Sequence, residues 1–473
     1  MGNEVDVVSA VRGVIEGFYG KPFSHRERID LLRVLGRHGY DCYVYAPKDD
    51  PLHRERWRDP YPEDELARFG ELTAEATRNG LRFVYAIAPG LSYDTADPAE
   101  FDRLARKVRA VIGCGAHGIA LLFDDLTADS TTLDPQIQAL LVRRTHDLVT
   151  RIDPQLAFWF IGNFYCGDAA ELQGDGGFWR ALYGGRSAVE YFDAYAQHVP
   201  ATVPIMWTGP AVFSATLRAH DVRAVAALAR RPVVLWDNFP VNDTLRDQLF
   251  LGPYAGREPG AARALHGVVL NLMSQAAANE IPLATAAEFL ANPDGYDPER
   301  ALERAVATAS PSPEAARALA TFVAVHRGHP VLAAHDTAHD LAARTAAAFE
   351  EGDGDATAIA SLREYLEELR DNEGRLAALL AGAPLLAEIE PWSRQLGRLA
   401  QAALAGVDAL AGTVAAAEYR AARDAARGGD HLVAATRLPQ ALQPFAAGAG
   451  TPVDRFGDLF AAIDRRLGPA SEG

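Results

Sequence analysis

The sequence contains very little lysine. Only three of its 46 basic residues are lysines, at positions 21, 48 and 107. In a chain so biased toward arginine, a lysine is expected where a compact ammonium donor is needed. Lys48 and Lys21 both follow predicted strands, and we expect Lys48 in particular to be functional. Lys107 falls within a predicted helix and is expected to be an ordinary surface residue.

Cysteine is equally scarce, with Cys42, Cys114 and Cys166 the only examples. An odd number of widely separated cysteines without Cys-x-x-Cys spacing argues against a disulfide framework and against a zinc site. We therefore expect reduced thiols and a cytoplasmic protein. The histidines do not show the spacing of a ligand set either, so neither a metal nor a cofactor is expected.

Long apolar runs are also absent. A helix that spans a bilayer needs about 20 apolar residues, and no run in this chain approaches that length. The first residues have neither a basic region nor an apolar core, so we expect no signal peptide. The formal net charge of −17 disfavours a polyanionic partner. We expect neither a membrane nor a nucleic acid as partner.

The sequence does contain eight short apolar runs that are rich in β-branched and aromatic residues. Continuous rather than alternating runs are typical of parallel strands covered on both faces. Segments with helical spacing separate most of them, beginning with 24–38, 63–79, 98–112 and 134–152. The alternation predicts an α/β fold, a (β/α)8 TIM-type barrel; an open nucleotide-binding sheet lacks support because no strand precedes a Gly-rich phosphate loop. The predicted strands are 11–18, 40–47, 82–89, 118–125, 155–162, 204–207, 232–236 and 267–270.

From about residue 292 the composition changes to Ala, Leu, Arg and Glu, with turn residues at helix-length intervals. This pattern predicts an all-α helical bundle. The chain is long enough for two hydrophobic cores, so we expect a barrel domain at 1–291 and a bundle domain at 292–473. We expect the bundle to form a groove wall or the surface of a homodimer. Its predicted helices are 314–327, 337–350, 356–372, 389–427 with a break near Gly406 or Gly412, and 454–467.

The pair Asp124–Asp125 closes the fourth apolar run. Two adjacent carboxylates are mutually repulsive and costly to desolvate, so packing alone rarely places them there. The C-terminal ends of barrel strands carry the catalytic residues in this fold. Adjacent residues on a regular strand, however, face opposite sides. Both side chains can reach one substrate only if the strand ends or kinks between them.

Six motifs give the chain a resemblance to a known family. In this order and at plausible spacing, they resemble glycoside hydrolase family 84, the O-GlcNAcases and related β-N-acetylglucosaminidases, some of them labelled hyaluronidases. The resemblance runs from about residue 12 to 298 and implies a catalytic barrel followed by a helical region. The motifs are Glu16-Gly17-Phe18-Tyr19-Gly20, Tyr45-Ala46-Pro47-Lys48-Asp49-Asp50, Phe123-Asp124-Asp125, Trp207-Thr208-Gly209-Pro210, Trp236-Asp237-Asn238 with Asn242-Asp243, and Leu251-Gly252-Pro253-Tyr254.

The resemblance also implies roles for individual residues. Asp125 would be the general acid and base, and Asp124 would orient the 2-acetamido group of the substrate, whose carbonyl oxygen attacks C1 in place of an enzyme nucleophile. Tyr165 would contact the developing oxazoline. The remaining contacts to the sugar would come from Gly17, Lys48, Asn238, Asp243 and Asn271, with Asp243 at O4 and O6.

Several alternatives remain open at the level of sequence. Trp236 is expected to bind the sugar, although Trp207 and Trp236 could each line a sugar pocket or pack in the core. Asn238 and Asn271 could cap loops, and Asp49 and Asp50 are expected to be loop carboxylates. The whole chain could instead be a Mg²⁺-dependent hydrolase built on its carboxylates, or a sugar-binding barrel without activity.

Within the glycosidase interpretation, the partners are proteins or glycans that carry N-acetylglucosamine. The expected reaction is retaining, exo-acting and substrate-assisted. The sequence does not distinguish O-linked GlcNAc on protein Ser or Thr from GlcNAc in small glycans or cell-wall fragments.

Overall fold

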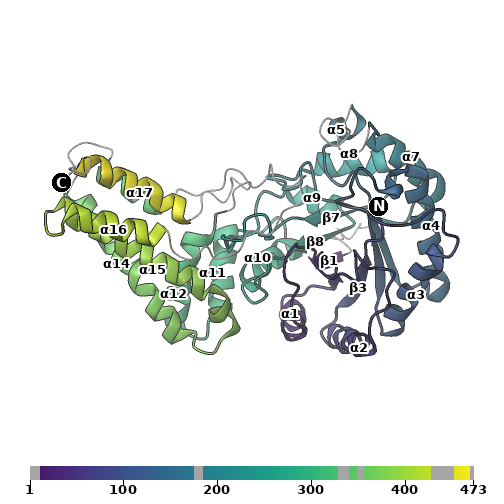
Figure 1. Ribbon diagram of the computed structural model, residues 1–473, viewed down its shortest axis with the longest axis horizontal. Helices are drawn as coiled ribbons and strands as arrows, with labels where there is room; N and C mark the ends of the chain where they lie inside the picture. Colours follow the sequence, from purple (N-terminus) through teal and green to yellow (C-terminus); the bar gives the residue numbers. More distant parts are fainter. Residues whose placement is uncertain (1–10, 175–184, 329–339, 350–355, 428–451, 469–473) are drawn as a thin grey trace.

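A closed parallel barrel forms the first part of the protein (Figure 1). The computed structural model describes residues 11–174, 185–328, 340–349, 356–427 and 452–468. Eight strands pair in chain order, and β1 closes the barrel against β8, with Val11 opposite Gly267 and Ile15 opposite Asn271. The predicted (β/α)8 architecture is confirmed.

Each predicted apolar run overlaps one strand of the barrel. The runs are continuous because the strands are enclosed on both faces, by the barrel interior and by the surrounding helices; every residue of β4, for example, is buried. The strands are β1 Val11–Glu16, β2 Cys42–Tyr45, β3 Arg82–Ile87, β4 Gly118–Leu122, β5 Ala157–Ile161, β6 Ile205–Trp207, β7 Val233–Asp237 and β8 Gly267–Asn271.

Two of the helices that follow strands begin at polar cap residues that the sequence pattern predicts. Ser24 caps α1 in a capping box with Glu27, and Asp134 caps α4, with Pro135 at its first position. The barrel helices are α1 His25–Arg37, α2 Glu63–Arg78, α3 Glu100–Gly113, α4 Pro135–Ile152, α5 Ala169–Gln173, α7 Ala188–His198, α8 Ala219–Ala229, α9 Pro259–Ala264 and α10 Glu280–Ala291, with a 3-10 turn, η1, at Thr131–Leu133.

The described residues after α10 form helices and no strands, and in Figure 1 these helices lie on the opposite side of the molecule from α3 and α4. The predicted break in the segment 389–427 occurs at Gly412, which has a φ of 73°. Gly406 lies inside a helix, where an added Cβ would come within 2.8 Å of the Tyr419 ring. The helices are α11 Pro298–Thr308, α12 Pro313–His326, α13 Asp340–Phe349, α14 Ala356–Leu379, α15 Pro384–Leu410, α16 Ala416–Arg427 and α17 Pro452–Leu467.

Two hydrophobic clusters organise the packing, and the second one includes residues from the barrel. Leu249, Phe250, Leu251 and Met273, in loops that follow β7 and β8, pack with apolar residues of α11–α17. In addition, Leu251 N donates to His326 O at 3.0 Å. The helical region is therefore packed directly against the loops at one end of the barrel. Among the described residues, no helix is long and apolar enough to cross a bilayer.

Candidate active site

The turn after β4 brings both carboxylates of the Asp124–Asp125 pair to one cavity. The strand ends at Leu122, and both aspartates lie in the following turn. Asp125 adopts left-handed backbone geometry, with a φ of 52°. This conformation is uncommon for non-glycine residues, and aspartate is among those that adopt it most readily. The end of the strand thus removes the alternation that would send the two side chains to opposite faces.

Asp124 is balanced by a buried cation. The Lys48 ammonium forms an ion pair with Asp124 Oδ2, and the two side chains are only 2% and 7% exposed. The ammonium also lies 5.5 Å from the centre of the Trp236 ring. The second oxygen, Asp124 Oδ1, is buried without a hydrogen-bond donor among the described residues. One oxygen is therefore committed to Lys48, and the other is available to a ligand that can donate a hydrogen bond.

Asp125 accepts a hydrogen bond at each of its oxygens. Tyr19 Oη donates to Oδ2 and Tyr165 Oη donates to Oδ1, both at 2.7 Å. Burial, and then the charge of Asp125, raise the pKa of Tyr19 well above its usual value, so this phenol keeps its proton. The two phenols therefore hold the Asp125 carboxyl group in a defined orientation.

A chain of amide hydrogen bonds joins strands on both sides of the barrel closure. Gly17 N donates to Asn271 Oδ1 at 3.1 Å, Asn271 Nδ2 donates to Asn238 Oδ1 at 3.0 Å, and Asn238 Nδ2 donates to Val212 O at 2.8 Å. Both asparagines thus tie loops together and line the cavity as well. An added Cβ on Gly17 would lie 2.5 Å from the Trp236 ring, so only glycine fits at this position.

Asp243 lies in the loop after β7, with its side chain in the same cavity. Its Oδ2 accepts a hydrogen bond from Tyr19 N at 2.9 Å. Burial raises the pKa of the Asp243 carboxyl to about 6, against the opposing effects of that hydrogen bond and of Arg246. This carboxyl therefore changes its charge close to neutral pH.

All nine residues predicted from the sequence line this one cavity. They come from the ends of β1, β2, β4, β5, β7 and β8, as expected for a site at the C-terminal face of a barrel. The predicted set is Gly17, Lys48, Asp124, Asp125, Tyr165, Trp236, Asn238, Asp243 and Asn271. The prediction did not assign a role to the other lining residues, which are Tyr19, Ile161, Thr208, Val212, Phe213, Val241 and Thr244.

Comparison with known proteins identifies the family. The family model described as beta-N-acetylglucosaminidase matches residues 12–324, which cover the barrel and extend into α12. The chain belongs to this family.

Three relatives illustrate the similarity. The Protein O-GlcNAcases of Rattus norvegicus and Mus musculus are each 32% identical to it over 281 residues, which cover 59% of this chain and 29% of theirs. The chain thus matches less than a third of the length of these curated relatives. A solved structure of a mutant O-GlcNAc hydrolase from Thermobaculum terrenum has a TM-score of 0.77 and 26% identity, covering 96% of this chain and 94% of that one.

Several residues of the family motifs have structural partners rather than positions in the cavity. Asp237 pairs with Arg257, with Nη2 to Oδ1 at 2.6 Å, and accepts a hydrogen bond from Tyr254 Oη at 2.7 Å. This interaction connects the motif at 236–238 to the motif at 251–254. Glu16 pairs in the same way with Arg28 at 2.8 Å. These buried pairs hold the loops that carry Gly17 and Asn238.

Other polar residues of the motifs also act within loops. Asp50 Oδ2 accepts hydrogen bonds from Tyr45 Oη at 2.8 Å and Tyr61 Oη at 2.6 Å, and Asp49 Oδ2 accepts one from Gly20 N at 3.1 Å. Both are loop carboxylates, as expected. Trp207 is buried and donates to Gly167 O at 3.1 Å, outside the residues that line the cavity. Its packing interpretation is therefore the correct one.

The prediction for Lys107 was wrong. Its side chain is buried rather than on the surface, and Nζ donates to Leu52 O at 2.6 Å and lies 4.6 Å from the centre of the Tyr61 ring. Burial lowers the pKa of this ammonium to about 8. Lys107 lies three residues after Leu104 and four before Val111, both buried on α3, so the helical spacing did contain the signal.

The described residues contain no group of three or more His, Cys, Asp or Glu side chains that could hold a metal ion. None of the three cysteines, which all lie in the described part of the chain, forms a disulfide.

Proposed function

We propose that the protein is a retaining exo-β-N-acetylglucosaminidase that uses the acetamido group of its substrate as the nucleophile. The observation that carries this proposal is the arrangement of Asp124 and Asp125. Both reach one cavity, where Asp124 has an oxygen free to accept a hydrogen bond and Asp125 is held by two phenols. Membership in the β-N-acetylglucosaminidase family supports the same reaction.

In the first step, Asp124 accepts a hydrogen bond from the acetamido N–H at Oδ1. This contact orients the acetamido carbonyl oxygen, which forms a bond to C1 as the bond from C1 to the glycosidic oxygen breaks. Asp125 gives its proton to the departing oxygen. The ionised Asp124, kept in place by Lys48, stabilises the positive charge that develops on the oxazoline N–H.

In the second step, Asp125 takes a proton from a water molecule whose oxygen attacks C1. The bond from C1 to the acetamido oxygen breaks, and the product keeps the β configuration because C1 is inverted twice. Tyr19 and Tyr165 stabilise the carboxylate form of Asp125 between the two proton transfers. Gly17, Lys48, Asn238, Asp243 and Asn271 bind the sugar, with Asp243 at O4 and O6, and Tyr165 contacts the oxazoline.

The test uses paired aryl and alkyl N-acetyl-β-glucosaminides under single-turnover conditions. General acid assistance matters only when the leaving group is too basic to depart as an anion. Asp125→Ala should therefore lower cleavage strongly for the alkyl substrate and little for an acidic aryl one. Asp124→Ala should lower both similarly, by about 2.7–4 kcal/mol of transition-state stabilisation. The opposite pattern would exchange the two roles, and normal activity in both variants would exclude the pair as the active site.

We propose O-GlcNAc on protein Ser and Thr as the substrate, rather than small glycans or cell-wall fragments. The names of the rat and mouse relatives, Protein O-GlcNAcase, support this choice. Purified enzyme would be given an O-GlcNAc peptide and chitobiose in parallel. A higher kcat/KM for the peptide supports the proposal, and a strong preference for chitobiose contradicts it.

A magnesium-dependent hydrolase receives less support from the same site. The Lys48 ammonium already pairs with one oxygen of Asp124, and the described residues contain no group of three or more His, Cys, Asp or Glu side chains that could hold a metal ion. Loss of activity in EDTA would favour the metal-dependent alternative. Cleavage of either glycoside would exclude a barrel that only binds sugar.

We propose that residues 1–291 form the catalytic unit and that residues 292–473 form a helical domain that supports it and provides a dimer surface. The packing of Leu249, Phe250, Leu251 and Met273 against the helices supports the first role. Sedimentation of the purified protein tests the second, because a monomer at all concentrations contradicts it.

We further propose a reducing, cytoplasmic location, which the absence of disulfides among the three described cysteines supports. Fractionation of cells tests this location.

A further inference from the structure

Arg54, which does not line the cavity, contacts both Tyr19 and the backbone of Asp125. Its Nη1 donates to Tyr19 Oη at 3.0 Å, and its Nη2 donates to the Asp125 backbone carbonyl at 3.2 Å. The guanidinium also lies 5.6 Å from the centre of the Tyr19 ring. Tyr19 Oη in turn donates to Asp125 Oδ2. The three residues form a closed ring of contacts around one carboxylate.

The direction of these hydrogen bonds follows from the chemistry of the donors. A guanidinium can only donate, so the Tyr19 oxygen must be the acceptor toward Arg54. The single phenolic hydrogen is then available only for Asp125 Oδ2. Arg54 therefore determines the direction in which the Tyr19 hydroxyl donates. Its planar guanidinium donates to the Tyr19 oxygen through one nitrogen and to the Asp125 backbone carbonyl through the other.

The charge of Arg54 is directed at the same carboxylate. Among the described residues, the hydrogen-bond acceptors of its partly buried guanidinium are a phenol and a backbone carbonyl, not a carboxylate. Burial alone would lower the pKa of Arg54, yet Tyr19, Asp125 and Asp124 raise it above its usual value. The cation is thus stabilised by the active-site anions without forming an ion pair that would neutralise it.

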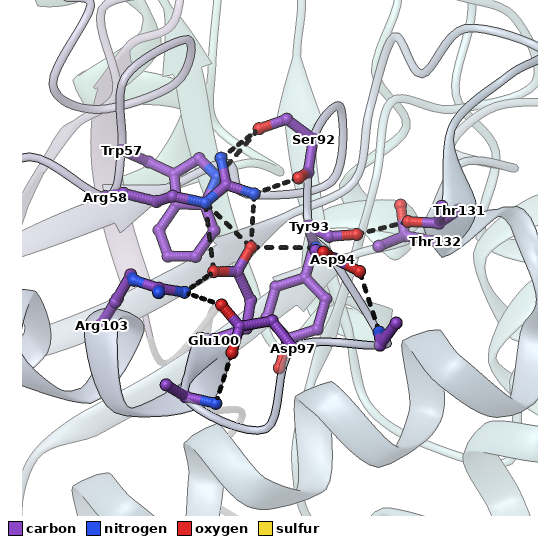
Figure 2. A network of polar contacts seen from close by, with 12 residues as sticks. Trp57, Arg58, Ser92, Tyr93, Asp94, Asp97, Glu100, Arg103, Thr131 and Thr132 are labelled. Carbon is purple, nitrogen blue, oxygen red and sulfur yellow. Dashed lines mark hydrogen bonds and ion pairs between the residues drawn. The ribbon is translucent and has the colours of Figure 1, made fainter.

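The loop that carries Arg54 contacts the loop after β3, and the loop after β3 also contacts the segment that follows Asp125. Figure 2 shows the contacts of Trp57 and Arg58 in the first of these loops. Trp57 Nε1 donates to Ser92 Oγ at 3.2 Å, and Arg58 Nε donates to the buried Glu100 at 2.9 Å. From the other side, Thr132 Oγ1 donates to Gly90 O at 2.6 Å. The loop after β3 therefore ties the loop after β2 to the loop after β4, and the distance from Arg54 to Asp125 is held by the scaffold.

We propose that Arg54 is a positioning residue for Asp125, which holds the left-handed turn at the Asp125 carbonyl and keeps Tyr19 oriented as a donor to the Asp125 carboxylate. This inference rests on the proposed function, in which Asp125 is the proton donor. Neither the sequence motifs nor the residues that line the cavity include Arg54. Its effect on the reaction passes entirely through Tyr19 and Asp125.

The experiment compares Arg54→Met with Arg56→Met, a control in the same loop whose side chain is exposed. Each variant is assayed on the paired alkyl and acidic aryl N-acetyl-β-glucosaminides. Arg54→Met should lower kcat/KM for the alkyl substrate by about 10- to 100-fold, because even a small displacement of the proton donor from the glycosidic oxygen slows proton transfer strongly. The aryl substrate, which needs little proton transfer, should lose less than about threefold. Arg56→Met should match the wild type on both.

The dependence of kcat/KM on the leaving group separates positioning from a merely structural role. Across a series of aryl and alkyl N-acetyl-β-glucosaminides, kcat/KM of Arg54→Met should fall more steeply with the basicity of the leaving group than kcat/KM of the wild type, because a misplaced Asp125 assists basic leaving groups poorly. Arg54→Lys keeps the charge but cannot donate to Tyr19 and to the Asp125 carbonyl with the geometry of a guanidinium, so it should show the same steep dependence. An equal loss on all substrates of the series overturns the proposal.

Tyr19→Phe provides a second route if Arg54→Met does not fold. It removes the phenol oxygen and leaves Arg54 in place, and it should show the same selective loss on the alkyl substrate; equal losses on both substrates overturn the proposal. Asp125→Ala serves as the reference, and adding Arg54→Met to it should cause no further discrimination between leaving groups. If Asp125→Ala itself shows no such discrimination, the proposed function has failed, and the inference fails with it. If Asp125→Ala discriminates and Arg54→Met does not, only the inference fails.

Discussion

At the scale of single residues, Asp243 combines the sugar-binding role that we propose for it with burial that disfavours its charged form. Its pKa is raised to about 6 by burial, so it loses its charge as the pH falls through that value. A hydrogen bond to an ionised carboxylate contributes about 1.5–3 kcal/mol, against about 0.5–1.5 kcal/mol for one between neutral groups. Wild-type affinity for a GlcNAc-based competitive inhibitor should therefore fall between pH 7.5 and 5. Asp243→Asn should bind weakly at both pH values, as calorimetry can measure.

The same substitution should have the opposite effect on stability. A carboxyl with a raised pKa in the folded state destabilises the protein as the pH rises through the window from about 4 to 6. Above pH 6, Asp243→Asn should consequently unfold at an equal or higher urea concentration than the wild type. Asp59→Asn, at an exposed loop position, is the control. A variant that keeps the pH dependence of inhibitor binding would show that another group is responsible.

The sequence singled out polar residues at the ends of apolar runs, and the structure brings these residues to one cavity. Lys48, Asp124 and Asn271 each lie at or just after the end of a strand, and all three line this cavity. Arg54 and Tyr19 could not be assigned in the same way. They lie in loops without periodicity, and their importance depends on contacts between residues far apart in the chain. The left-handed geometry of Asp125 is also set by the fold and leaves no mark in the sequence.

At the scale of elements, Glu388 on α15 connects the helical region to the loop before α10. Its carboxylate accepts hydrogen bonds from Ala277 N at 3.0 Å and Ala278 N at 2.9 Å. Burial and, to a smaller extent, the charge of Glu27 raise the pKa of Glu388 to about 7, against the opposing effect of these hydrogen bonds. Asp30 and Glu280 line the same cavity. The contact therefore joins the two regions through an acid that titrates near neutral pH.

The raised pKa of Glu388 determines how its contribution to the stability of the fold changes with pH. Between about pH 4.5 and 7 the folded state holds a proton that the unfolded state has lost, so stability falls as the pH rises through this window. In the wild type, the Glu388 carboxyl should make the free energy of unfolding lower at pH 8 than at pH 5 by on the order of 2 kcal/mol. Glu388→Gln should remove this contribution. Urea denaturation measures this difference. Glu390→Gln, exposed on the same helix, should leave it unchanged, and equal slopes in all three proteins would contradict the assignment.

Element boundaries were predictable where a polar cap begins a helix, as at Ser24 and Asp134. α11, at Pro298–Thr308, was not predicted, although Asp297 caps it and a proline occupies its first turn. The segment predicted at 356–372 continues as α14 to Leu379. An alanine- and leucine-rich sequence forms helix readily, so its ends depend on tertiary packing rather than on composition.

At the scale of the whole molecule, the helical region supports loops that carry site residues. Trp392 Nε1 donates to Asp247 O at 2.8 Å, four residues from Asp243. Deleting residues 292–473 should expose the apolar residues that follow β7 and β8 and loosen this loop. We expect a lower soluble yield and a reduced kcat/KM on a glycopeptide. Size-exclusion chromatography and glycopeptide assays measure both effects.

A milder variant separates the contact from the general loss of packing. Trp392→Phe keeps an aromatic ring and removes the N–H that contacts Asp247 O. It should raise KM for the glycopeptide with little change in solubility, because the effect passes through the Asp243 loop. Full retention of kcat/KM and of oligomeric state in the deletion variant would show that the helical region has no part in the site.

The closure of the barrel by β1 and β8 has a consequence for the order in which the chain can fold during synthesis. β1 emerges first from the ribosome, but its partner β8 is not complete until Asn271 has been made. Until then the outer edges of β1 and of the most recent strand are exposed to pairing with other chains. Such distant pairings form slowly, and unpaired edges promote aggregation. Nascent chains arrested before β8 should thus require chaperones more than chains arrested after it, which pulse-labelling of stalled ribosomes can measure.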